Sequence, residues 1–515
     1  MKKFIYAALA VAAVLLFASC KNDKNQPKSE AGDAYVSFTF NLPQGGTRAG
    51  VDGKTAGQEY VGTDAEQKIS AVRVVLFDTN SREVKYALDY GITGAGNAAP
   101  TGEVVAGATA AKFTTKAKEI VSQDYLMLAI INPTQKVKDA TAVGKFLKDA
   151  ETAIESTVSD LSTGGILMSN DRGLVKVEAT SLQATEGAAE AAPVKVSVDR
   201  ILAKVFVGGT PTFKTGKLED IKWGLNVTNK KTFIFRQFGK YVKAVDQFEP
   251  ETATDNSTRF QRYAQDPNFS GAFVAADFEY QVGTPTLNGT FGYADADGQY
   301  CLENTMDASS QKIQQTTSFI LSGVWTPENH DNITFTKGET WYSCQGFTFS
   351  KDKMVEYKKA IDKDTNNKLT HIDGTPRGFV DALRAALNGG LTVDAQGDVT
   401  ASTTVKDVKA YKGGVCYYQT NLIRHFNDSQ SSKSMGYGRY GVVRNNIYKI
   451  NITKIERPGE PTVENDKDKD KNDDPDKAYI SFEVTVNPWI VRTQDISLSS
   501  LSTLCMSNRE TSNPL

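Results

Sequence analysis

Apolar residues alternate with other residues in two similar segments near opposite ends of the chain. The first, AYVSFTFNL, spans 34–42, and the second, AYISFEVTV, spans 478–486. A period of two is typical of a β-strand with one buried face. The predicted buried residues are Val36, Phe38, Phe40 and Leu42 in the first segment and Ile480, Phe482, Val484 and Val486 in the second. Because the two segments are so similar, we expect them to fit the same groove.

Further strand-like segments recur at even spacing. They are rich in β-branched and aromatic residues and are bounded by Gly, Asn or Pro. The strongest lie at 71–79, 125–132, 194–209, 221–229, 316–327, 414–423 and 446–455. Helical patterns are sparse, with one helix predicted at 376–388 and a weaker pattern at 142–160. The sequence therefore predicts a mostly β fold, and the even spacing favours β-sandwiches over a parallel sheet.

The length of the chain predicts more than one core, because single cores seldom exceed about 250–300 residues. The sequence has 515 residues, and its composition changes at GGTPTFKTG, residues 208–216. Clusters of Gly and Pro of this kind mark boundaries between regular elements. We therefore predict an N-terminal β-sandwich domain at 49–210 and a C-terminal β-sandwich domain at 211–459.

A charged segment separates the second domain from the last strand. Residues 460–477 read EPTVENDKDKDKNDDPDK, with almost no apolar side chains. Such a composition cannot form a core, which predicts an extended, solvated linker. The strand at 478–498 is then tethered and able to reach a distant groove, and residues 499–515 form a tail. The alternative is a long surface loop that returns the strand to its own sheet.

The N-terminus has the parts of an export signal. Lys2 and Lys3 precede an apolar run that ends in Ala-Ser-Cys at position 20, which predicts a signal peptide over residues 1–19. The Phe-Ala-Ser-Cys ending resembles a bacterial lipobox, in which cleavage leaves a lipidated cysteine, here Cys20. The charged residues that follow are then a solvated tether. The alternative is an ordinary exported protein with a spare cysteine.

Charge and candidate chemistry exclude several classes of function. With 59 basic and 61 acidic residues and no basic stripe, the chain is a poor match for nucleic acid as a partner. No catalytic motif surrounds the three histidines, His330, His371 and His425, and there is no Walker loop. We therefore assign no catalytic or cofactor-binding residue and predict that the protein is not an enzyme.

The cysteines after Cys20 and one acidic loop leave alternatives open. The cysteines are widely spaced, which fits one disulfide or buried free thiols: Cys301, Cys344, Cys416 and Cys505. The loop 362–373 spaces Asp362, Asp364, Asn366 and Asp373 almost as a calcium loop does. A polar turn before the next helix is the favoured interpretation, because Asn367 stands where glycine is required. No metal ligand is assigned.

Several motifs occur in a characteristic order. GVVRNNIYKINITKIERPG at 441–459 is followed by a charged linker and then by AYISFEVTVNPWIVRTQDISL at 478–498. Weaker motifs are VSVDRILAKV at 196–205, GILMSN at 165–170, CLENTM at 301–306 and the stretch 314–327. Together they resemble the Bacteroidales fimbrillins, particularly the shaft subunit of the short, or minor, fimbriae. The resemblance extends from Cys20 to Leu498.

The resemblance implies two tandem β-sandwich domains of transthyretin-like, Greek-key type. It also implies export through the periplasm as an outer-membrane lipoprotein precursor that carries palmitate. An arginine-specific protease would then cut the loop after the first strand, at the bond between Arg48 and Ala49. This cut removes residues 20–48, and with them both the lipid and the first strand.

Loss of the first strand would open an apolar groove with unpaired backbone groups, which an added strand completes. The resemblance implies that the donor strand is the C-terminal strand of the next subunit. A break is expected at Pro488, which has no backbone N–H. Trp489 is then expected on the opposite face or wedged between the domains, the alternative being a core tryptophan.

The expected function is that of a structural subunit of adhesive surface fimbriae, or pili. Its partners would be copies of itself and accessory tip and anchor subunits. Two alternatives stay open: a monomeric surface lipoprotein that binds glycan or host protein, and an accessory tip or anchor fimbrillin. The chain departs from the family in the 17 residues that follow Leu498, which we interpret as an overhang outside the groove.

Overall fold

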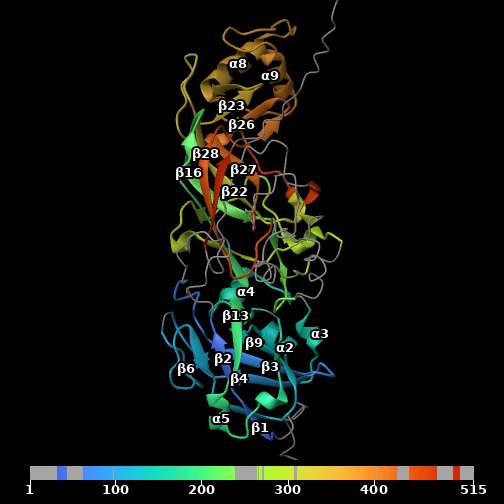
Figure 1. The fold of residues 1–515 in the computed structure, drawn as a ribbon. Helices are drawn as coiled ribbons and strands as arrows, with labels where there is room; N and C mark the ends of the chain where they lie inside the picture. The colour runs from blue at the N-terminus through green and yellow to red at the C-terminus, as the bar shows by residue number, and fades with distance from the viewer. Residues whose placement is uncertain are drawn as a thin grey trace, which may run out of the picture.

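The described residues form two groups of β-sheets that lie end to end (Figure 1), which we call the N-terminal and C-terminal domains. The computed structural model describes residues 32–42, 62–237, 264–425, 440–471 and the backbone of 491–498, apart from positions 97, 153, 172, 265, 269–271, 307–309 and 402. In Figure 1 the N-terminal domain is blue to green and the C-terminal domain green to red. The longest described helix, α8 (Lys351–Lys363), has 13 residues, and no helix of the described part qualifies as a membrane span. The prediction of a mostly β fold is confirmed.

The N-terminal domain is built on one eight-stranded sheet with the order β4-β3-β9-β11-β13-β2-β7, in which β12 also pairs with β9. Its strands are β2 (Phe38–Asn41), β3 (Val72–Asp78), β4 (Val84–Tyr90), β7 (Lys112–Thr114), β9 (Tyr125–Ile131), β11 (Met168–Asn170), β12 (Val175–Val177) and β13 (Val194–Arg200). Two short pairs accompany it: β1 (Ala34–Val36) with β8 (Lys118–Ile120), and β5 (Ile92–Thr93) with β6 (Thr101–Gly102). β13 connects two parts of the sheet, because residues 194–197 pair with β2 and residues 198–200 with β11.

The sheet curls around a core formed by one of its faces. Val74 and Leu76 of β3 lie in this core together with Phe40 of β2. Val75 and Phe77, which alternate with them, belong to a second core on the opposite face. β3 is therefore buried on both faces, which explains its almost continuous run of apolar residues.

Short helices contribute to the second core. They are α2 (Gln135–Ala140), α3 (Leu147–Ala150) and α4 (Val158–Ser162), while α5 (Glu186–Ala191) lies beside β1. The helical pattern at 142–160 thus corresponds to two short helices with β10 (Ile154–Glu155) between them. A new helix begins after Thr157, because its hydroxyl accepts a hydrogen bond from the backbone N–H of Asp160.

The C-terminal domain has two sheets with a shared core. The first contains β14 (Leu202–Gly208), β15 (Thr212–Phe213), β21 (Gln299–Leu302), β28 (Ile447–Ile455) and β29 (Val491–Leu498). The second contains β16 (Gly216–Asn226), β20 (Gly289–Thr290), β22 (Ser318–Pro327) and β27 (Val415–Leu422). Val207 and Ile450 from the first sheet pack in one core with Trp223 and Leu321 from the second. A separate pair joins β17 (Thr228–Asn229) to β19 (Phe278–Glu279).

A smaller unit forms the end of the molecule farthest from β1 (Figure 1). It lies between β22 and β27 in the chain and contains α8, α9 (Phe379–Asn388) and a sheet of β23 (Trp341–Cys344), β24 (Phe347–Ser350), β25 (Thr403–Val405) and β26 (Val408–Tyr411). The helix predicted at 376–388 is confirmed as α9. α8 was not predicted, because only Met354, Tyr357 and Ile361 are buried in a helix that is otherwise mostly charged.

The chain passes from one domain to the other at Ile201, which alone separates β13 from β14. β13 pairs within the N-terminal sheet, whereas β14 pairs with β21 and β28. The boundary predicted at 208–216 thus lies among residues whose neighbouring strands, β14 and β15, both pair with β28. The Gly and Pro residues of 208–216 lie between strands of the C-terminal domain, whereas the chain crosses at a bend formed by Ile201.

Candidate functional site

The first strand-like segment of the sequence occupies an interior position in the N-terminal sheet. β2 pairs in parallel with β13 on one side and antiparallel with β7 on the other. β1 pairs separately with β8. The predicted single strand at 34–42 is thus two short strands, which break at Ser37, where the side-chain hydroxyl donates a hydrogen bond to the carbonyl oxygen of Thr115 over 2.7 Å. We call the position of β1 and β2 the N-terminal strand slot.

Apolar side chains fill the inner face of this slot. Val36, Phe38 and Phe40 are at most 2% exposed, which confirms three of the four predicted buried residues, whereas Leu42 is only partly buried. The ring of Phe40 stacks on Phe113 of β7 with 4.9 Å between ring centroids. At roughly 1.5–3 kcal/mol for each large apolar side chain, burial of these three contributes about 5–9 kcal/mol. Removing the strands would expose this surface and the unpaired backbones of β7 and β13.

The outer face of the slot is polar, and its residues Ser37 and Thr39 are covered, at 1% and 2% exposed. Thr39 lies opposite Thr114 of β7, with 2.7 Å between their hydroxyl oxygens, and opposite Lys195 of β13. Asn41 lies opposite Lys112 of β7. Lys112 and Lys195 are both exposed. The alternation of inner and outer residues agrees with the period of two that the sequence shows.

The other predicted site residues lie outside the described part of the chain. These are Cys20, Arg48, Ala49, Ile480, Phe482, Val484, Val486 and Trp489. Their assignments stay predictions.

The first part of the predicted linker packs on the C-terminal domain. Val463 exchanges two backbone hydrogen bonds with Gly283, and Glu460 does so with Tyr417. Asp466 is fully buried, where its carboxylate accepts hydrogen bonds over 2.7 Å from the amide groups of Asn226 and Gln419. Part of the predicted linker, including Val463 and Asp466, therefore packs on the domain, which supplies partners for its polar groups.

The backbone of β29 adds a strand to the same domain. β29 runs parallel to β28, with Val491 opposite Ile447 and Leu498 opposite Ile455. On its other side β28 pairs with β14 and β15. The last third of the predicted donor strand therefore pairs with its own domain, because β28 offers it an edge of unpaired backbone groups.

A buried ion pair joins the two domains. Glu66, from the segment before β3, receives a hydrogen bond over 2.7 Å from the Lys204 ammonium on β14, and both side chains are at most 2% exposed. The hydroxyl of Tyr300 on β21 also donates to this carboxylate. Burial alone would raise the pKa of Glu66, but the hydrogen bonds from Lys204 and Tyr300 outweigh it and lower the pKa below its ordinary value of 4.5.

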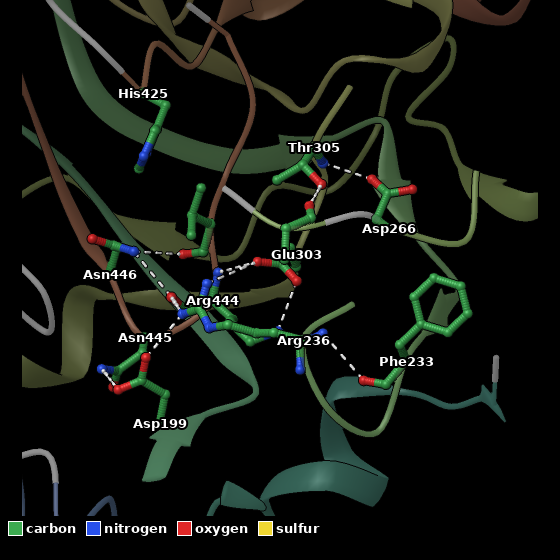
Figure 2. A network of polar contacts seen from close by, with 12 residues as sticks. Asp199, Phe233, Arg236, Asp266, Glu303, Thr305, His425, Arg444, Asn445 and Asn446 are labelled. Carbon is green, nitrogen blue, oxygen red and sulfur yellow. Dashed lines mark hydrogen bonds and ion pairs between the residues drawn. The ribbon is translucent and has the colours of Figure 1, made fainter. Parts of the chain in front are cut away.

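Figure 2 shows a second buried network of polar contacts. Arg236 binds Asp199 of β13 with an N–O distance of 3.0 Å, and Arg444 binds Glu303 with a distance of 2.7 Å. Asn445 donates a hydrogen bond to Asp199 over 2.7 Å. Two guanidinium groups thus balance two carboxylates, and Asp199 is the member of this set that comes from the N-terminal domain.

An apolar cluster and a short ladder also cross this junction. The second core contains Leu128 of β9 together with Phe206 and Ile447 of the C-terminal domain. β10 pairs with β18 (Lys231–Thr232) across the same boundary. We call these contacts and the buried ion pairs the domain seam. Sequence reasoning missed its residues, although Asp199, Arg200 and Lys204 interrupt an apolar strand, and that interruption was the available signal.

The structure places three of the cysteines and the acidic loop for which the sequence left alternatives open. Cys301, Cys344 and Cys416 are free and buried, and burial raises the pKa of each thiol to about 12. Cys505 lies outside the described residues. Asp364 ends α8, accepts the backbone hydrogen bond of Leu369 over 2.7 Å and binds Arg384. Within the described residues no cluster of acidic, His or Cys side chains suits a metal ion.

Comparison with known proteins identifies the C-terminal part of the chain. Residues 409–495 match the family model "Major fimbrial subunit protein type IV, Fimbrillin, C-terminal". This region is similar to the C-terminal domain of the fimbrillins. It contains β27, β28 and most of β29, so the pairing of the last strand lies within the fimbrillin region. The resemblance to the Bacteroidales fimbrillins is confirmed.

Several known proteins are similar to this chain. Over 96% of this chain and 99% of the relative, it is 22% identical to the minor fimbrium subunit Mfa1 of Porphyromonas gingivalis. A solved fimbrilin (fimA) structure from P. gingivalis W83 is 14% identical, with 92% of this chain and 100% of that chain covered and a TM-score of 0.36. The P. gingivalis tip fimbrial protein Mfa3, solved with a C-terminal truncation, is 13% identical over 58% of this chain and 83% of its own, with a TM-score of 0.30.

Truncation of Phe40 tests the packing of the N-terminal strand slot. We expect Phe40→Ala to lower the free energy of unfolding of the uncut protein by about 3–5 kcal/mol, because it leaves a cavity against Phe113. Phe146→Ala is the matched control, since Phe146 is 41% exposed and its loss should cost less than about 1 kcal/mol. Urea unfolding measures both. Equal losses in the two variants would contradict the packing described for β2.

Neutralising Glu66 tests the domain seam. We expect Glu66→Gln to destabilise the protein by about 3–5 kcal/mol at pH 7, because Lys204 is left buried without its counter-charge. Glu83→Gln, in the exposed pair with Lys85, should cost less than about 1 kcal/mol.

The effect of Glu66 should also depend on pH. The folded state lowers the pKa of Glu66 from 4.5, so its stabilising contribution is full above that pH and is lost as the pH falls through the lower, folded-state value. The stability difference between the wild type and Glu66→Gln should therefore shrink below about pH 4.5. Urea unfolding from pH 7 to pH 3 measures it, and a difference that grew on acidification would overturn the assignment.

Proposed function

We propose that the protein is a structural subunit of adhesive surface fimbriae that polymerises by donor-strand exchange. The observation that carries this proposal is the position of β2. It is an interior strand between β13 and β7, and a near copy of its sequence occurs at 478–486. A chain with two candidates for one interior position has the means to exchange one for the other between molecules.

In this proposal the protein is exported as a lipoprotein precursor with lipid on Cys20, anchored in the outer membrane. Arg48 lies seven residues beyond the end of β2 at Asn41. Cleavage there by an arginine-specific protease separates β1 and β2, together with the lipid, from the rest of the chain. The strands are then held in the slot only by hydrogen bonds and by the apolar contacts of Val36, Phe38 and Phe40.

The C-terminal strand of a second copy then fills the slot. Ile480, Phe482, Val484 and Val486 take the inner positions, and residues 478–486 match the nine residues of the first copy in length. The pairing of β29 with β28 holds the adjoining residues 491–498 on their own domain before exchange. Copies of this chain form the fibre, and accessory tip and anchor subunits complete it.

Protease treatment tests the processing step. We expect an arginine-specific protease to convert the purified precursor into SDS-resistant ladders whose subunits begin at Ala49, because only this cut frees the strand slot. Arg48→Ala should remain monomeric and keep its lipid, as mass spectrometry would show. Arg82→Ala, in the exposed turn between β3 and β4, is the control and should assemble normally. Ladders formed by Arg48→Ala would contradict this processing site.

Deletion of the C-terminal strand tests donation. We expect protein cut after Arg48 to stay monomeric when residues 478–515 are removed, and to form ladders when only residues 499–515 are removed. Size-exclusion chromatography and unheated SDS gels measure both. Persistent ladders without residues 478–515 would refute donation by this strand.

A monomeric surface lipoprotein that binds glycan or host protein is the second candidate. The pairing of β29 with its own β28 favours it, because a strand that completes its own domain has no need of a neighbour. If the full-length protein stays monomeric after complete cleavage at Arg48, this second candidate replaces the first.

A further inference from the structure

The two copies of the strand would place similar residues on the inner face of the N-terminal strand slot but different residues on its outer face. When Ala478 is aligned with Ala34, the inner residues keep their apolar character throughout. On the outer face Ser481 repeats Ser37, and Thr485 replaces Asn41. Glu483, however, takes the place of Thr39. The second copy therefore brings a negative charge to a position where the first copy has none.

The slot places a positive charge beside that position. Lys195 on β13 is the residue directly opposite Thr39, and opposite residues on paired strands lie on the same face. Lys195 is exposed, and within the described part of the chain it has no ion-pair partner. The next outward residue on β2 is Asn41, and Lys112 of β7 lies opposite it. The neutral first copy leaves both ammonium groups without a counter-charge on β2.

We infer that the C-terminal strand of a second copy enters the slot in the register that places Glu483 beside Lys195 and Ser481 in the position of Ser37. The inference rests on the proposed strand exchange and adds its register and its charge recognition. The Glu483–Lys195 pair exists only after exchange. It therefore favours the incoming strand over the return of the cleaved first strand.

Shifts of the register are each disfavoured by a described contact. A shift of one residue would turn Glu483 toward the core beside Phe113. A shift of two in one direction would put Glu483 in the position of Ser37, which is as buried as that of Thr39. There the side chain meets the carbonyl oxygen of Thr115, an acceptor that repels a carboxylate, whereas the Thr39 position has Lys195 opposite it. A shift of two in the other direction would force a tyrosine, Tyr479, into the position of Ser37. One register satisfies all three constraints.

Disulfide trapping between two kinds of subunit tests the register. All variants carry Cys505→Ser, and cleavage at Arg48 separates Cys20 from the subunit, so that the remaining native thiols, Cys301, Cys344 and Cys416, are buried. One subunit carries Thr114→Cys and lacks residues 478–515, so it acts only as an acceptor. The other carries Glu483→Cys. The 2.7 Å between the hydroxyl oxygens of Thr39 and Thr114 places the two introduced thiols within bonding reach.

After cleavage at Arg48, mixing and mild oxidation, we expect a covalent dimer with Glu483→Cys and at least about tenfold less with donors carrying Ser481→Cys or Thr485→Cys. A stronger cross-link from either of these donors would overturn the register while leaving strand exchange intact. Absence of any assembly on mixing would instead count against the proposed function.

Reversing the charge of Lys195, and then that of Glu483, tests whether the two side chains recognise each other. We expect Lys195→Glu to slow assembly of the cleaved protein about tenfold, because a cross-strand attraction becomes a repulsion. Adding Glu483→Lys in the same chain should restore the rate. Lys145→Glu, an exposed lysine outside the slot, is the charge-matched control.

The melting temperature of the uncut Lys195→Glu precursor should match that of the wild type, which separates slow exchange from misfolding. Lys195→Gln provides a second variant with a smaller charge change and should slow assembly less. Assembly by Lys195→Glu at the wild-type rate, or failure of Glu483→Lys to restore it, would refute the charge recognition.

Discussion

The ladders that β2 forms with β13 and β7 are the contacts on which the N-terminal domain depends. An edge strand can be lost with only one ladder broken, but an interior strand holds its neighbours on both sides. The backbone groups of β13 and β7 and the apolar contacts around Phe40 must therefore always have a partner. A cut in the loop after β2 would break the covalent link between β2 and the rest of the chain. It would leave the ladders and the apolar contacts of β2 in place.

The domain seam converts two domains into one elongated body. Glu66 with Lys204, and Asp199 with Arg236, are ion pairs that water does not reach, and breaking one leaves a charge stranded. The second core supplies apolar contacts across the same boundary.

The strand pattern was predictable where one face of a segment is apolar, as at Phe38 and Phe40, because the period of two follows from the pleat of the backbone. α9 was found for the same reason, at the helical period. α8 was missed because three buried residues do not stand out among its charged ones. The predicted linker begins at residue 460. Its local sequence could not indicate that Val463 and Asp466 bind Gly283 and Asn226, which lie far away in the sequence.

By itself, the sequence determined the β class, the two copies of one strand and the family resemblance, since these depend on local periodicity and on motifs that neighbouring residues carry. Only the tertiary structure decided that β2 is an interior strand, that the domains meet at Ile201 and that β29 pairs with β28. It also brought Lys195 opposite Thr39. The physical reason is that strand pairing and buried charge pairs join residues far apart in the chain, and no local pattern encodes which of them will meet.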